Sequence, residues 1–318
     1  MWAVSCTTVD SMVTALISHP DCGLHEMGDL HPECPARTDV IADYLLSLRL
    51  LDFLAQYDAP LVTREQLLRV HSASYLDWLQ QRLPESGYFD IDLDTRMNPK
   101  TLVAAHRAAG AAVLAVDLVA TGRAENAFCN IRPPGHHATS NTAMGFCFFN
   151  NVAVAAAHAL AEYPFERVAI LDFDVHHGNG TDVIFENDPR VLVCSLFQRD
   201  LYPFSGELAH EGTGINVKLP AGSGGEEMRK PVEQTWLPAL ADFRPDMIFV
   251  SAGFDAHASD EMSDLVFSDA DFRWLTKLTL DVAATYAGGR LVSVLEGGYD
   301  LHSLARCAAA HVKILAGL

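Results

Sequence analysis

The sequence predicts an α/β protein with one domain, built on a parallel β-sheet with helices on both faces. In the carboxyl-terminal two thirds of the chain, short runs rich in β-branched residues alternate with stretches rich in alanine or leucine. Such an alternation of strands and helices is typical of a parallel sheet. No linker, block of like charge or internal repeat marks a boundary in the 318 residues. We therefore expect a single domain over residues 1–318.

The first expected element is a helix over residues 36–54, among segments without a clear pattern. Five runs of nearly continuous apolar character have the composition of strands covered on both faces: 127–131, 167–173, 190–196, 247–252 and 290–295. Four further helices are expected at 101–120, 150–163, 269–286 and 301–315.

Polar segments follow four of the expected strands directly. Active sites of open α/β sheets form outside the carboxyl ends of the strands, so we expect these segments to converge on one pocket. They are Arg132-Pro-Pro-Gly-His-His137, Asp174-Val-His-His-Gly-Asn-Gly180, Gly253-Phe-Asp-Ala-His257 and Glu296-Gly-Gly-Tyr-Asp300.

A divalent metal site is the strongest local prediction. Asp172, Asp174 and His176 alternate along a segment that we expect to be extended, which would place their side chains on one face. Two buried carboxylates and an imidazole would be poorly solvated there without a cation, although a turn with a solvated aspartate is the alternative. We expect Asp174, His176 and Asp255 to be the ligands, because three protein ligands leave a position for water, as in catalytic zinc sites.

Two adjacent histidines and one tyrosine are the candidate catalytic groups. His136 and His137 follow a stiff Pro-Pro-Gly turn, and a pair beside a metal favours general acid–base chemistry over a purely structural role. Each would need an orienting partner, for which Asp172 and Asn179 are the candidates. Tyr299, after two glycines, is expected to donate a hydrogen bond to a developing oxyanion; a packed tyrosine is the alternative.

Aromatic residues on two segments predict a narrow tunnel. Phe146, after Gly145, and Tyr202 would face each other across a channel suited to an extended aliphatic chain, although an ordinary core is possible. Gly214, in Gly212-Thr-Gly214, is expected where the backbone must pass close to another group. A metal, two oriented histidines, a tyrosine and a slender channel together indicate metal-assisted amide hydrolysis.

These motifs, in this order, resemble the zinc-dependent histone deacetylase and acetylpolyamine amidohydrolase superfamily of the arginase–deacetylase fold. The resemblance covers nearly the whole chain, from His31-Pro-Glu-Cys-Pro-Ala-Arg37 to Glu296-Gly-Gly-Tyr-Asp300. It implies an eight-stranded parallel sheet, one zinc ion on the predicted ligands, and Phe146 and Tyr202 as tunnel walls. It also implies a structural K⁺ or Na⁺ ion at residues that match the family's monovalent cation site: Asp172, Asp174, His176, Ser195 and Leu196.

Individual residues refine this resemblance. Asn179 is similar to the class II and bacterial branch, and Tyr299, where that branch often has histidine, predicts a competent deacetylase. Cys34 stands where related proteins carry an arginine of the entrance loop.

The residues expected at the tunnel mouth leave the substrate open. Met262 falls at the gating position, where a glutamate would indicate polyamine preference. Asp260, Glu261 and Asp264 nevertheless surround it with negative charge, so cationic substrates remain plausible. Asp94 is the candidate rim acid that would bind a substrate backbone.

Composition restricts the partners and the location. With 41 acidic and 22 basic residues the net charge is −19, which would repel nucleic acid, although the acidity could serve solubility alone. Seven cysteines, without a Cys-x-x-Cys pair, favour a reducing, cytoplasmic setting without disulfides. The N-terminus lacks a signal-peptide pattern, and we expect no apolar run to approach the roughly 18–20 residues of a membrane span, so no membrane partner is predicted.

The expected function is zinc-dependent hydrolysis of an N-acetylated or otherwise acylated amine, such as acetyl-lysine. The alternative substrate is an acetylpolyamine, and iron could replace zinc on these ligands. An arginase-like manganese hydrolase would need further bridging aspartates, whose spacings are not found. A non-enzymatic acyl-binding protein is disfavoured by the intact histidine pair and Tyr299.

Overall fold

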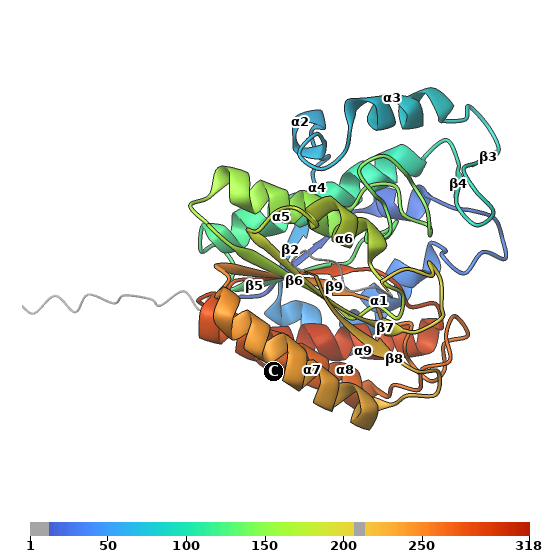
Figure 1. The fold of residues 1–318 in the computed structure, drawn as a ribbon. Coiled ribbons are helices and arrows are strands. Elements are labelled where there is room, and N and C mark those ends of the chain that lie inside the picture. Colours follow the sequence, from blue (N-terminus) through green and yellow to red (C-terminus); the bar gives the residue numbers. More distant parts are fainter. Residues whose placement is uncertain (1–12, 207–213) are drawn as a thin grey trace, which may run out of the picture.

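An eight-stranded parallel sheet forms the centre of the molecule (Figure 1). The computed structural model describes residues 13–206 and 214–318. Within these residues the strand order is β2-β1-β5-β10-β9-β6-β7-β8. The strands are β1 Ala15–Ser18, β2 Ala55–Asp58, β5 Asn126–Cys129, β6 Val168–Asp172, β7 Val191–Gln198, β8 Gly214–Leu219, β9 Met247–Ala252 and β10 Leu291–Leu295. A short antiparallel hairpin, β3 Phe89–Asp90 and β4 Arg96–Met97, lies apart from the sheet. The predicted fold class is confirmed.

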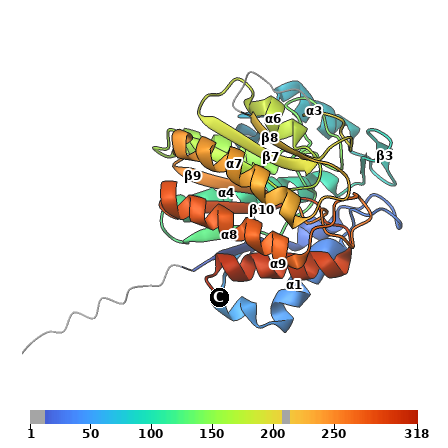
Figure 2. The same ribbon diagram turned by 60° about the horizontal axis from the view of Figure 1, so that its bottom comes forward.

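Helices cover both faces of the sheet, as Figures 1 and 2 show. One face carries α4 (Thr101–Ala120) and α5 (Asn151–Glu162); the other carries α1 (Ala36–Ser47), α7 (Gly225–Phe243), α8 (Asp269–Tyr286) and α9 (Leu301–Leu315). Successive strand side chains therefore enter two different cores: Ile170 packs in the first and Leu171 in the second. The remaining short helices are η1 Pro20–Leu24, η2 Leu50–Phe53, α2 Arg64–Leu67, α3 Ala73–Arg82 and α6 Asn179–Phe185.

The five predicted strands all exist, with ends that shift by no more than two residues. The strands that were not predicted are β1, β2 and β8 of the sheet and the two strands of the hairpin, β3 and β4. At the sheet edge, β2 has half-buried residues alternating with exposed ones, so it lacks the continuous apolar run of a central strand.

The predicted helix over residues 36–54 is wrong in its second half. Helix α1 ends at Ser47, and Arg49 adopts a left-handed conformation with φ 58°, after which the chain forms the short helix η2. The leucine-rich sequence continued the apolar pattern past this break. Helix α7 was not predicted. It contains Pro231 and Pro238, which usually interrupt helices, but it buries a stripe at helical spacing: Met228, Val232, Trp236 and Leu240.

Helix α4 corrects the expectation about apolar length. Thr101–Ala120 is long and apolar enough to cross a membrane by length and composition, with a mean hydropathy of 1.6 over its most apolar window. However, 72% of that window is buried inside the protein, as in the core helix of a globular fold. The six cysteines of the described part all have free thiols.

Candidate metal centre and active site

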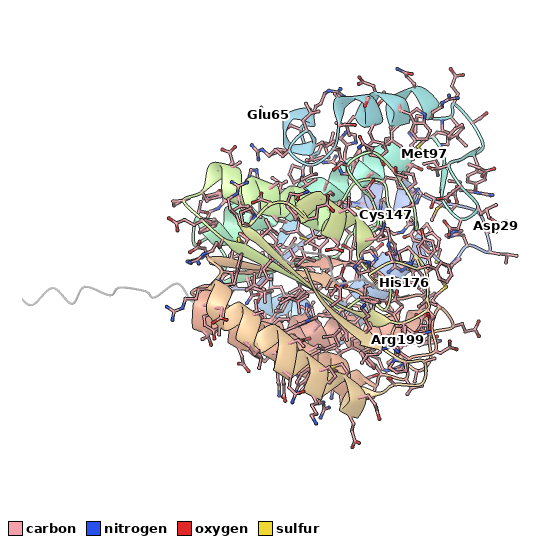
Figure 3. All side chains as sticks on the ribbon, viewed as in Figure 1. Asp29, Glu65, Met97, Cys147, His176 and Arg199 are labelled. Atoms are coloured by element: carbon pink, nitrogen blue, oxygen red, sulfur yellow. The ribbon has the colours of Figure 1, made fainter. Side chains whose placement is uncertain are left out.

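The polar segments predicted at strand ends lie together in the structure. They follow β5, β10, β9 and β6, which are neighbours in the sheet. The carboxyl ends of parallel strands meet at one edge, and Figure 3 places His176 and Cys147 on this side of the molecule. The expected convergence on one site is therefore observed.

Three buried side chains form the candidate metal centre. One ligand atom each from Asp174, His176 and Asp255 lies within 4.8 Å of the others. Nδ1 of His176 is 3.0 Å from Oδ1 of Asp174 and 3.2 Å from Oδ2 of Asp255. Oδ1 of Asp255 accepts a hydrogen bond from the backbone N–H of Val175, which ties the aspartate after β9 to the segment that carries the other two. The structure thus brings together the three residues that were predicted as ligands.

The local backbone differs from the expectation of an extended segment. Strand β6 ends at Asp172, and the chain bends through Asp174 to His176. Oδ1 of Asp172 accepts the N–H of Asp174, and Oδ1 of Asp174 accepts the N–H of His176, so each aspartate closes a turn of the kind typical of this residue. The side chains converge through these turns and not through strand alternation.

The surroundings of the three residues fit a divalent cation. A Cβ at Gly297 would lie 2.0 Å from Oδ2 of Asp255 and 2.5 Å from Oδ2 of Asp174, and a Cβ at Gly253 would lie 2.2 Å from the latter atom. Oδ2 of Asp255 is buried and makes no hydrogen bond. Two glycines therefore leave room around these carboxylate oxygens, and Oδ2 of Asp255 faces Nδ1 of His176 at 3.2 Å without completing a hydrogen bond. Oxygen and nitrogen ligands of this kind suit zinc or iron.

The pKa values of Asp255 and His176 also indicate a cation site. Burial and the adjacent Asp174 raise the pKa of Asp255 to about 7. Burial disfavours a charged His176, but its contacts with Asp174 and Asp255 outweigh burial and raise its pKa to about 10. The two carboxylates thus need nearby positive charge, which a bound cation supplies more directly than a proton.

The two adjacent histidines have different partners. Nδ1 of His136 is 3.0 Å from Oδ2 of Asp172, and Nδ1 of His137 is 2.7 Å from Oδ1 of Asn179. Burial opposes a charged His136, but the carboxylates of Asp174 and Asp172 outweigh it and raise its pKa well above the usual value. Burial, reinforced by the two neighbouring imidazoles, lowers the pKa of His137 well below its usual value.

The partner of His137 also sets its tautomer. The amide Nδ2 of Asn179 faces Sδ of Met144 at 3.5 Å, which leaves Oδ1 toward the histidine. With Oδ1 as the acceptor, His137 carries its proton on Nδ1, and its Nε2 is left as a base. Both histidines therefore have the orienting partners that were proposed for them.

Tyr299 lies on a turn that is held by hydrogen bonds from several directions. The N–H of Gly297 donates to Oδ2 of Asp174, and the guanidinium of Arg37 donates to the carbonyl oxygen of Gly298 at 2.6 Å. Gly298 has φ 119°, which side chains other than glycine rarely allow. Burial raises the pKa of Tyr299 well above its usual value, so the phenol is neutral and able to donate.

A narrow cavity of about 170 Å³ reaches these groups. It is lined by Asp94, His137, Gly145, Phe146, His176, Leu201, Tyr202, Met262 and Tyr299. The ring of Phe146 meets that of Tyr299 edge-on at 5.8 Å, and the ring of Tyr202 lies 5.2 Å from His137. Gly145 is needed here, because a Cβ would lie 2.4 Å from the His137 ring.

One residue predicted for the tunnel lies elsewhere, and one that was not predicted lines it. Gly214 begins β8, where a Cβ would lie 2.8 Å from Oδ1 of Asp182, and it is not among the residues that line this cavity. Its close approach is therefore to Asp182. Leu201 adds an apolar wall beside Tyr202. The only sign of this role in the sequence is that Leu201 directly precedes Tyr202.

The acidic residues at the mouth are arranged differently from the expectation. Asp260 is buried, and its carboxylate accepts backbone N–H groups. Oδ2 of Asp264 accepts a hydrogen bond from the Gln198 side chain. Glu261 is exposed and lines a groove of about 440 Å³ that shares Met262 with the cavity. Glu261 and Asp264 are both exposed, but only Glu261 lines the groove; Asp260, which lines the groove too, is buried and its carboxylate bonds within the protein.

A buried ion network behind the site was not predicted. Glu33 accepts two hydrogen bonds from Arg132, at 2.7 and 2.6 Å, and a third from Arg37. Oε2 of Glu296 accepts the N–H groups of Gly135 and His136. The motif from His31 to Arg37 contains Glu33 and Arg37, but nothing in the sequence indicates that Arg132 is their partner.

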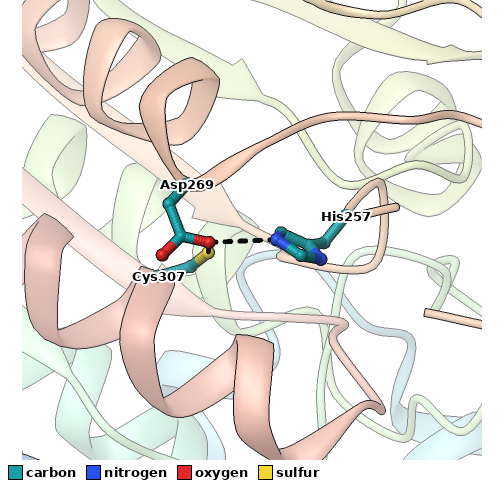
Figure 4. A group of neighbouring side chains, drawn as sticks. All are labelled: His257, Asp269 and Cys307. Carbon is teal, nitrogen blue, oxygen red and sulfur yellow. Dashed lines mark hydrogen bonds and ion pairs between the residues drawn. The ribbon is translucent and has the colours of Figure 1, made fainter. Parts of the chain in front are cut away.

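A second group of possible ligands, His257, Asp269 and Cys307, is a structural contact (Figure 4). Nε2 of His257 is 3.0 Å from Oδ1 of Asp269, and Nδ1 of His257 accepts the N–H of Ser259. Arg306 already pairs with Asp269, and burial raises the pKa of the Cys307 thiol well above its usual range, so the thiol stays protonated. These groups satisfy one another and attach the segment after Asp255 to α8 and α9.

Comparison with known proteins identifies the family of this chain. A model of the histone deacetylase domain matches residues 31–315. A histone deacetylase-like amidohydrolase of Pseudomonas aeruginosa is 41% identical over 267 residues, which cover 82% of this chain and 70% of that protein. The polyamine deacetylase HDAC10 of Homo sapiens is 35% identical over 330 residues, which cover 96% of this chain and 48% of that protein.

A solved structure shares the whole fold. The crystal structure of the HDA15 HD domain superposes with a TM-score of 0.90 at 33% sequence identity, covering 96% of this chain and 88% of that one. The chain therefore belongs to the histone deacetylase family and is an enzyme.

Proposed function

We propose that this enzyme is a zinc-dependent deacetylase that hydrolyses the amide bond of an N-acetylated amine, with an acetyl-lysine side chain as the preferred type of substrate. The observation that carries the proposal is that one narrow cavity is lined by His176, His137 and Tyr299 together. A metal ligand, a base and a hydrogen-bond donor are the groups that amide hydrolysis needs around one carbonyl.

Asp174, His176 and Asp255 would hold the zinc ion, which supplies Lewis acidity at the substrate carbonyl when bound. His137, with its proton on Nδ1, takes a proton from the attacking water at Nε2 and then gives it to the leaving amine. The neutral phenol of Tyr299 donates a hydrogen bond to the oxygen that gains negative charge. His136 stays hydrogen-bonded to Asp172 beside it.

The shape of the cavity supports an acyl group on a slender chain. Phe146 and Tyr202 are the proposed walls for the aliphatic part of the substrate, and Met262 is the proposed gate. Asp94 is exposed and lines the same cavity, so we propose that it binds a substrate N–H at the rim. We also retain the proposed K⁺ or Na⁺ ion: Asp172 and Ser195 are paired on β6 and β7, and Oγ of Ser195 is buried without a hydrogen bond.

An acetylated polyamine is the second candidate substrate. One relative is named a polyamine deacetylase, and the exposed Glu261 stands next to Met262 at the mouth, where it would attract a distal ammonium group. The apolar Met262 at the mouth offers no charge of its own, which is why we place the peptide first.

The test measures amine release from an acetyl-lysine peptide and from an acetylated diamine by zinc-loaded protein, with and without a chelator. Chelator-sensitive cleavage of the peptide supports the proposal, and cleavage of the diamine alone would move the assignment to polyamines. Tyr299→Phe, which removes only the hydroxyl, should lower kcat by about 10²–10³-fold with zinc retained. Absence of turnover on both substrates would contradict the proposal and favour a protein that only binds acyl groups.

A further inference from the structure

The carboxylate of Asp260 has an unusual set of partners. Asp260 is 5% exposed, and Oδ2 accepts backbone hydrogen bonds from Tyr299 at 2.6 Å and from Asp300 at 3.0 Å. Oδ1 accepts a third, from the N–H of Met262 at 3.1 Å. A charged acceptor on a backbone N–H makes a stronger bond than a neutral one, so these contacts restrain the segments that they join.

The turn that carries Tyr299 depends on such contacts, because it cannot be held by its own side chains. The two preceding residues are Gly297 and Gly298, which have none. Arg37 restrains the carbonyl oxygens of this turn, and Asp174 restrains the N–H of Gly297. The backbone of Tyr299 itself is restrained by Asp260, through the shortest of its three bonds.

The same carboxylate connects two walls of the cavity. Met262 and Tyr299 both line the cavity, and both donate their backbone N–H groups to Asp260. The segment around Asp260 is itself attached to α8, through His257 and Asp269 (Figure 4). A displacement of Asp260 would therefore move the phenol relative to the metal ligands. The carboxylates of Asp255 and Asp174 keep their bonds to the N–H groups of Val175 and His176, and the start of the turn stays bonded to Asp174 through Gly297.

We infer that Asp260 is a positioning residue that places the Tyr299 hydroxyl for catalysis by holding the backbone of the Gly297–Tyr299 turn. This inference rests on the proposed function, since it assigns Tyr299 the role of hydrogen-bond donor to the developing oxyanion. It predicts that a change at Asp260 acts on turnover through Tyr299, without removing the metal.

The main variant is Asp260→Asn, which keeps the shape but replaces the charged acceptor by a neutral amide. The bonds to Tyr299 and Asp300 are weakened if the amide oxygen faces them and are lost if the NH₂ group does. Since misplacement of a catalytic group by about 1 Å costs up to ~10²-fold in rate, kcat should fall by about 10–100-fold with little change in KM. Asp264→Asn is the matched control. Asp264 lies in the same segment but bonds to Gln198 and not to the turn, so its variant should keep wild-type kcat. Asp260→Ser serves as a second variant if the amide prevents folding.

A double-mutant cycle separates positioning from a general structural role. In the Tyr299→Phe background the hydroxyl is absent, so Asp260→Asn should lower kcat little further. An equal fold-loss in both backgrounds, or an unchanged kcat in the single variant, would overturn the inference. Zinc content should equal that of wild type in every variant.

A measurement that does not depend on catalysis tests the role of Asp260 independently of the proposed function. With 3-fluorotyrosine at position 299, the ¹⁹F resonance of the metal-free protein should shift or broaden in Asp260→Asn and stay in place in Asp264→Asn. An unmoved resonance in both would contradict the positioning role. If wild type cleaves neither substrate but the resonance moves as expected, the positioning stands and the proposed reaction fails.

Discussion

Gly297→Ala is expected to disrupt the metal centre by adding one methyl group. A Cβ at this position would lie 2.0 Å from Oδ2 of Asp255 and 2.5 Å from Oδ2 of Asp174. Ordinary contacts of a Cβ begin at 3.4 Å, so the first oxygen would have to retreat by about 1.4 Å. Metal–ligand distances tolerate only about 0.2 Å, so both carboxylates would leave their coordinating positions.

The assay is zinc binding by calorimetry on metal-free protein, which needs no substrate. We expect Gly297→Ala to bind zinc at least about 100-fold more weakly than wild type, because loss of an orienting neighbour alone costs about 10–100-fold. Gly23→Ala is the matched control: its Cβ would meet nothing within 4 Å. Zinc affinity in Gly297→Ala equal to that in Gly23→Ala, with both proteins folded, would refute the assignment of Asp174 and Asp255 as ligands.

Three further predictions concern Glu33, Asn179 and the buried His311 of α9, whose ring contacts Thr276 and Ser293. Glu33→Gln leaves Arg132 buried without its counter-charge and should lower the free energy of unfolding by about 3–5 kcal/mol, measured in urea; a loss below about 1 kcal/mol would contradict it. Burial lowers the pKa of His311 to about 3 from 6.5, so the unfolded chain alone gains this proton as pH falls from 6.5 to 3. Stability should then drop by up to about 1.4 kcal/mol per pH unit from this residue, and less steeply in His311→Gln. Asn179→Leu removes the acceptor of His137 and should reduce kcat about tenfold or more with zinc retained; wild-type kcat would exclude the orienting role.

The sequence predicted the centre of the fold better than its edges. Strands such as β6 and β9 are buried on both faces, so their composition alone identifies them. The edge strand β2 has the mixed pattern of a half-exposed segment. The predicted helix over residues 36–54 ran too far because the left-handed Arg49 interrupts an apolar pattern that continues in sequence.

The candidate site likewise contains residues that the sequence predicted and residues that it did not. The three candidate ligands and the histidine pair stand at strand ends, and chain topology brings them together. The contact of Asp260 with Tyr299 and the pairing of Arg132 with Glu33 join segments that are far apart in the chain. No regular spacing in the sequence predicts such pairs. Gly214 does lie close to another group, as predicted, but the sequence does not reveal that this group is Asp182.

Zinc titration into metal-free protein, with amine release from an acetyl-lysine peptide as the readout, tests the central claim most directly. We predict that turnover rises in proportion to zinc and stops rising at one equivalent per chain, since Asp174, His176 and Asp255 form one site. Turnover that is independent of added zinc, or a folded, zinc-saturated protein that releases no amine, would contradict it.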